Sequence, residues 1–101
     1  MIKLEWIRSY VSRGEYYFSG HADVERQNDE LSIVEIEDAL NNGMMLESYE
    51  DTGRGESCLI TGFTTAGKPI HIVIGRRGDR PVIITTYIPT PPKFKNLYER
   101  G

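Results

Sequence analysis

The sequence has little cysteine and histidine and no long apolar run, and each shortage excludes a class of protein. One cysteine cannot form an internal disulfide, and two histidines far apart give no metal-ligand spacing. Glycine-rich nucleotide loops and the Gly-x-Ser-x-Gly elbow are also missing. No apolar run approaches the roughly 18 residues that span a bilayer, and no apolar signal segment opens the chain. We therefore expect a cytoplasmic protein with no metal, no other cofactor and no membrane contact.

The remaining composition fits one globular domain over residues 1–101. The chain is 39% hydrophobic and 27% charged, which is enough apolar content for one modest core. Its charge is uneven, because residues 1–50 hold 4 basic and 11 acidic side chains, whereas residues 51–101 hold 8 and 4. The acidic half argues against a protein coated in nucleic acid, and the basic half allows either a local anion site or ordinary surface.

Apolar spacing and capping residues predict three helices. Leucine, isoleucine and valine at helical spacing predict a helix over residues 2–13. A second helix opens near Ser19, where a short polar residue precedes the next helical stretch. Ser32 and Glu35 form a capping box for the third helix, and Gly43 ends that helix with the freedom to adopt the left-handed conformation.

Runs of β-branched and aromatic residues predict the strands. They lie at residues 15–18, 44–49, 57–65, 69–75 and 81–88. The resulting order is α-β-α-α-β-β-β-β, with a core over residues 15–95 that follows the N-terminal helix. We expect an α+β fold in which the helices cover one face of a small antiparallel sheet and leave the other face open to a ligand.

A histidine in the middle of an apolar strand is the first candidate for a functional site. A hairpin about Gly78 places His71 opposite Thr85, with Tyr87 next on the same face, and the preceding turn places His71 opposite Gly62. A glycine in a strand leaves room for a ligand near the backbone. The alternatives are that His71 is a packed structural residue and that Tyr87 is an aromatic residue at the sheet edge. The predicted core face carries Ile70, Ile72, Ile74, Val82, Ile84 and Ile88.

His21 and Arg26 are the second candidate. On a helix, His21 and Glu25 share a face at the i,i+4 spacing, whereas Arg26 points elsewhere unless the helix begins after His21. Histidine titrates near neutral pH and arginine binds phosphate through two parallel hydrogen bonds. The alternative interpretation is a local structural bridge between His21 and Glu25.

Several short motifs, taken together in order, resemble the DUF4258 family over roughly residues 17–95. They are Ser19-x-His21-Ala22-x-x-Glu25-Arg26, Leu31-Ser32-x-x-Glu35-Ile36-Glu37-x-Ala39-Leu40-x-x-Gly43, Glu47-x-Tyr49, Cys58-Leu59-x-x-Gly62-Phe63-Thr64, Gly67-Lys68-Pro69-Ile70-His71-Ile72-Val73 and Ile84-Thr85-x-Tyr87-x-Pro89. That family is similar to the RelE and ParE class of small toxins. The resemblance implies a RelE-like fold, and a toxin paired with an antitoxin protein that is often of the zinc-ribbon kind. It also singles out His21, Arg26, His71, Thr85 and Tyr87 together.

The resemblance implies a metal-independent endoribonuclease that cuts messenger RNA. In that reaction the ribose 2′-OH attacks the adjacent phosphate, which requires a base, an acid and a cation. His71 serves as base or acid, Tyr87 positions the phosphate or donates a proton, and Arg26, or Lys93 and Lys95, neutralise charge. The acidic first half motivates the alternative, a non-catalytic interaction module, and a small-ligand binder is the third interpretation.

Overall fold

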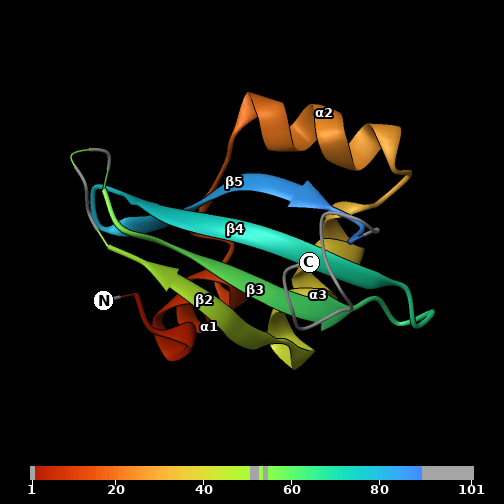
Figure 1. Cartoon of the computed structure of the whole chain (residues 1–101), viewed down its shortest axis with the longest axis horizontal. Coiled ribbons are helices and arrows are strands. Elements are labelled where there is room, and N and C mark those ends of the chain that lie inside the picture. Colours follow the sequence, from red (N-terminus) through yellow and green to blue (C-terminus); the bar gives the residue numbers. More distant parts are fainter. Residues whose placement is uncertain (1, 51–52, 54, 90–101) are drawn as a thin grey trace.

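Three helices pack against a five-stranded mixed sheet in the computed structural model, which describes residues 2–50, 53 and 55–89 (Figure 1). The elements are α1 (Leu4–Ser12), β1 (Tyr17–Phe18), α2 (Gly20–Asn28), α3 (Ile33–Asn42), β2 (Met44–Tyr49), β3 (Ser57–Phe63), β4 (Pro69–Arg77) and β5 (Arg80–Tyr87). The predicted α+β class and element order are confirmed. No described helix is long and apolar enough to cross a membrane.

The sheet has the order β1-β5-β4-β3-β2. Strands β2 to β5 form the predicted antiparallel meander, but β1 pairs with β5 in parallel, through Tyr17 with Val82 and Phe18 with Ile83. The prediction of a wholly antiparallel sheet is therefore wrong at this edge. Nothing in a two-residue strand shows which distant strand it will join, because its pairing depends on the tertiary fold.

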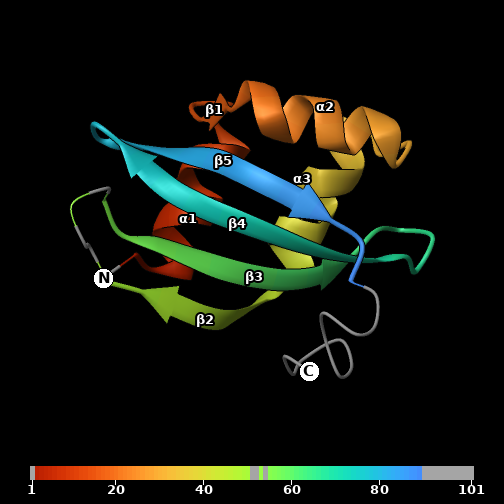
Figure 2. The same ribbon diagram turned by 45° about the horizontal axis from the view of Figure 1, so that its top comes forward.

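Helices α1 and α3 cover one face of the sheet, as Figure 2 shows, and the main core lies between them and the strands. Alternating strand residues supply the sheet side of this core, since successive side chains point to opposite faces. The fully buried members include Ile7, Ile36, Leu40, Ile60, Ile70, Ile72, Ile74 and Ile83. Burial of each such side chain contributes about 1.5–3 kcal/mol.

The end of α3 is closed by an arginine from α1. Arg8 donates from Nε to the carbonyl of Leu40 at 3.1 Å and from Nη2 to the carbonyl of Gly43 at 2.6 Å, which satisfies carbonyls that a helix end leaves open. Gly43 has φ −83° and ψ 178°, so the predicted left-handed conformation is wrong. Glycine is needed there for space, because a Cβ would lie 2.6 Å from the carbonyl oxygens of both Ala39 and Thr61.

Helix α2 lies along the edge of the sheet beside β5 rather than with the other two helices on one face (Figure 1). Ser19 fixes the start of the helix. Its hydroxyl accepts a hydrogen bond from the amide of Ala22 at 3.0 Å and donates one to the carbonyl of Ile84 at 2.8 Å. The amide of Ser19 also donates to the carbonyl of Ile83 at 2.9 Å. The helix thus covers an edge that would otherwise expose unpaired backbone groups.

Candidate functional site

The observed register gives His71 different neighbours from those predicted. His71 lies opposite Thr61 on β3 and Tyr87 on β5, rather than opposite Gly62 and Thr85. The turn before β4 shifts the first pairing by one residue. The second pairing shifts by two residues, one from the β4–β5 turn and one from an irregularity between Val73 and Ile74. Because side chains alternate between faces, the one-residue shift changes which β3 side chains join His71.

Gly62 does not leave a gap for a ligand, so its predicted role in binding substrate is wrong. It pairs with Ile70 and faces α3, where a Cβ would lie 2.1 Å from the carbonyl oxygen of Ala39. The missing side chain allows the backbone of α3 to approach the sheet closely.

An irregularity in the β4–β5 ladder changes which β5 residues face the core. Val73 pairs with Thr85 and Ile74 with Ile83, which leaves Ile84 as an extra residue. Ile83 therefore joins the core, whereas Ile84 is 39% exposed. Of the predicted core face, Ile70, Ile72 and Ile74 are confirmed, Val82 and Ile84 point to the other face, and Ile88 lies beyond the end of β5.

We call the side of β3, β4 and β5 that faces away from α1 and α3 the open face. Its side chains at one end, given by alternation along the paired strands, are Leu59, Thr61, His71, Val73, Thr85 and Tyr87. The predicted sharing of one face by His71, Thr85 and Tyr87 is thus confirmed. The rings of His71 and Tyr87 meet edge to face with centroids 5.5 Å apart.

His71 is fully buried, so the predicted open cleft around its ring is wrong. A substrate cannot touch this imidazole in the observed arrangement. The ring nevertheless lies on the open face and not in the layer packed against α1 and α3. In this arrangement the imidazole contacts the ring of Tyr87.

His21 is the exposed imidazole of the site. Its side chain is 71% exposed, and its Nε2 lies 3.4 Å from Oε2 of Glu25, which confirms the alternative of a local bridge. Glu25 in turn accepts hydrogen bonds from the hydroxyl of Thr85 and from the amide of Thr86 at 3.1 Å. The result is a polar chain that runs from α2 to β5, which we call the His21–Glu25–Thr85 chain. Sequence reasoning placed Glu25 beside His21 but missed its bonds to β5.

Arg26 does not join this chain. Because α2 begins at Gly20, His21 and Arg26 point in different directions, and Arg26 donates from Nε to Asp23 at 2.8 Å. Its Nη1 donates to the carbonyl of Leu31 at 3.3 Å, which ties the end of α2 to the following loop. The predicted cations Lys93 and Lys95 lie outside the described residues.

Neither a metal centre nor a reactive thiol is present in the described part of the chain. No group of three or more His, Cys, Asp or Glu side chains there is placed to hold a metal ion. Cys58 is buried in the core, and burial, followed by the nearby Glu56 carboxylate, raises the pKa of its thiol to about 11. A thiol that stays protonated at neutral pH is a poor nucleophile.

Comparison with known families gives a match over most of the chain. The model described as "Domain of unknown function (DUF4258)" matches residues 18–88, which run from β1 to just past β5 and leave out α1. No curated protein and no solved structure matches the chain significantly.

Proposed function

The chain belongs to the DUF4258 family, whose function is unknown, and on that premise we propose that it is the toxin of a bacterial toxin–antitoxin pair and acts as a metal-independent endoribonuclease in the cytoplasm. The observation that carries the proposal is the His21–Glu25–Thr85 chain, an exposed imidazole whose carboxylate partner is fixed to the sheet. The class of substrate comes from the expectation that the DUF4258 family is similar to the RelE and ParE toxins.

The proposed reaction transfers a phosphoryl group within the RNA strand. His21 takes the proton of the ribose 2′-OH as the oxygen attacks the adjacent phosphorus, and the bond from phosphorus to the 5′-oxygen breaks. Glu25 orients the imidazole and stabilises the imidazolium that forms, as the carboxylate of a catalytic triad does. Thr85 holds Glu25 in place through its hydroxyl. Tyr87, held by His71, positions the phosphate or protonates the leaving oxygen.

Cleavage of RNA in EDTA tests the activity. The native protein, freed from any partner, should cut a mixed messenger RNA substrate in EDTA, and His21→Ala should cut it at least about 100-fold more slowly. Because His21 is exposed, this variant should keep its fold, which circular dichroism checks. Arg26→Ala is the matched control, since it removes a charged side chain of the same helix that is paired with Asp23. RNA left intact by the native protein contradicts the proposal.

Expression in bacteria tests the biological role. Induction of the native chain should arrest growth, and co-expression of the antitoxin, in this class often a zinc-ribbon protein, should restore it and yield a stable complex. His21→Ala should not arrest growth at the same protein level.

The complete burial of His71 favours a second candidate, an interaction module without catalytic activity. Under this alternative the exposed surface of α2 binds a partner protein, and the acidic first half of the chain limits contact with RNA. Growth arrest that survives in His21→Ala, together with intact RNA, identifies this alternative.

A further inference from the structure

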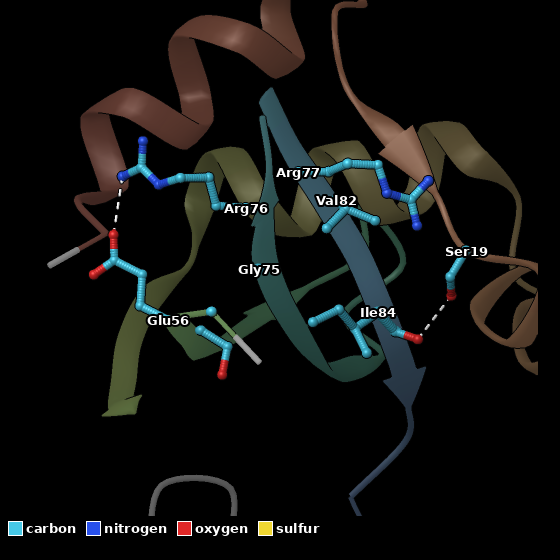
Figure 3. Close-up of a pocket in the computed structure, with 9 residues that line it drawn as sticks. Ser19, Glu56, Gly75, Arg76, Arg77, Val82 and Ile84 are labelled. Carbon is cyan, nitrogen blue, oxygen red and sulfur yellow. Dashed lines mark hydrogen bonds and ion pairs between the residues drawn. The ribbon is translucent and has the colours of Figure 1, made fainter. Parts of the chain in front are cut away.

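A cavity of about 400 Å³ lies on the open face near the β4–β5 turn, as Figure 3 shows, and His71 is not among the residues that line it. The residues that line it are Ser19, Gly55, Glu56, Ser57, Gly75, Arg76, Arg77, Val82 and Ile84. Its volume is near the lower end of the range for pockets that take one small ligand, roughly 300–1,000 Å³.

The floor of the cavity is made of hydrocarbon, because Gly75, Val82 and Ile84 line it. Gly75 carries no side chain, and a Cβ there would lie 2.7 Å from Cδ1 of Ile84, so this glycine makes room for the isoleucine. Val82 pairs with Gly75, and Ile84 reaches the open face because it is the extra residue of the β5 irregularity. A planar ring that rests on such a floor removes apolar surface from water.

One guanidinium at the cavity is available to an anion. Within the described residues the guanidinium of Arg77 has no hydrogen bond or ion pair, and its Cζ lies 5.3 Å from the centroid of the Tyr17 ring. Arg76 differs, because it forms an ion pair with Glu56 at 3.1 Å and lies 4.3 Å over the ring of Trp6. Figure 3 shows Arg76 turned toward Glu56, whereas Arg77 extends across Val82.

We propose that this cavity binds one nucleotide of the RNA substrate, with the base on the hydrocarbon floor and the phosphate on Arg77. Guanidinium binds phosphate through two parallel hydrogen bonds, and a base that lies on hydrocarbon removes apolar surface from water. Ser19 joins the cavity to the catalytic group, because it lines the cavity and caps the helix on which His21 is the second residue. The assignment of the ligand rests on the proposed ribonuclease function.

Arg77 and Arg80 provide a matched pair of variants. Both guanidiniums lie over the ring of Tyr17, that of Arg80 at 5.9 Å, but only Arg77 lines the cavity. The probes are adenosine monophosphate, adenosine and inorganic phosphate, each titrated into ¹⁵N-labelled protein and followed by amide chemical shifts. Adenosine monophosphate should shift the amides of Gly75, Val82 and Ile84. Arg77→Ala should weaken its binding about tenfold or more, as loss of a hydrogen bond to a charged group does, and Arg80→Ala by less than about threefold.

Three results would overturn the nucleotide site. They are an absence of shifts at the cavity, inorganic phosphate that binds as tightly as the nucleotide, and equal weakening by Arg77→Ala and Arg80→Ala. Ile84→Glu gives a second test, because a carboxylate on the floor should abolish nucleotide binding.

The failure of this proposal is distinct from the failure of the ribonuclease proposal. His21→Ala should bind adenosine monophosphate as the native protein does. A nucleotide that binds at the cavity of a protein that leaves RNA intact rejects the catalysis and keeps the site. RNA cleavage without shifts at the cavity rejects the site and keeps the catalysis.

Discussion

The carboxylate of Glu25 accepts a hydrogen bond from the backbone amide of Thr86 at 3.1 Å. A side chain of α2 thus supplies an acceptor that a neighbouring strand would otherwise supply to β5. The same carboxylate accepts a hydrogen bond from the hydroxyl of Thr85 and lies 3.4 Å from Nε2 of His21. One residue therefore closes the sheet edge and orients the exposed imidazole, so its replacement should affect both stability and activity.

Replacement of Glu25 by alanine should lower the free energy of unfolding by about 1–3 kcal/mol, because two hydrogen bonds to a charged, partly buried acceptor are lost. Glu25→Gln keeps one acceptor oxygen and should lose less. Urea denaturation measures both. The control is Glu15→Ala, which removes an exposed carboxylate 3.7 Å from Arg13 and should change stability by less than about 0.5 kcal/mol. Equal losses in Glu25→Ala and Glu15→Ala would show that α2 is not held by this carboxylate.

Gly62→Ala should destabilise the protein by roughly 3 kcal/mol or more, because the added Cβ would lie 2.1 Å from the carbonyl oxygen of Ala39 and must push α3 from the sheet. Gly20→Ala is the matched control, since a Cβ at that helix position meets nothing within 4 Å and should change stability by no more than about 1 kcal/mol. Thermal unfolding of the two variants compares them directly. A Gly62→Ala protein as stable as Gly20→Ala would contradict the close packing of α3.

The capping box should give part of the stability a dependence on pH. The amide of Ser32 donates to Oε1 of Glu35 at 2.9 Å, and this bond lowers the pKa of the carboxyl below 4.5. Because the folded-state pKa is the lower one, the contribution of the ionised carboxylate is complete above 4.5 and is lost as the pH falls through the folded-state value. The difference in the free energy of unfolding between the native protein and Glu35→Gln should shrink as the pH falls through that value. An NMR titration midpoint for Glu35 at or above 4.5 would disagree with this account.

Cys58 should resist thiol reagents while the protein is folded. Its side chain is buried and the pKa of its thiol is raised to about 11, so little thiolate forms at pH 8. We expect at least about a hundredfold slower reaction with an aromatic disulfide reagent in buffer than in urea, since access requires opening of the core. Rapid labelling of the folded chain would place the thiol at the surface.

The local elements could be predicted from the sequence because their signals are local. Ser32 and Glu35 form the predicted capping box, Ser19 caps α2, and the strand Met44–Tyr49 has the predicted bounds. Each depends on contacts within a few residues or on alternation along one strand.

The register of the strands could not be predicted in the same way. The neighbours of His71 depend on the turn before β4 and on the extra residue at Ile84, and neither leaves a clear mark in the sequence. A shift of one residue moved Gly62 from the side of His71 to the face that packs on α3. The pattern of the strand likewise shows a histidine among apolar residues but not the depth at which its ring lies.

The contact between Ser19 and Ile84 joins positions that are 65 residues apart in the chain. During synthesis β1 therefore lacks the strand with which it pairs, and α2 lacks the strand that it contacts most, until β5 has been made. Contacts of such long range slow the search for the native state. A product that stops short of Arg80 would lack the strand that joins β1 to the sheet and supports α2.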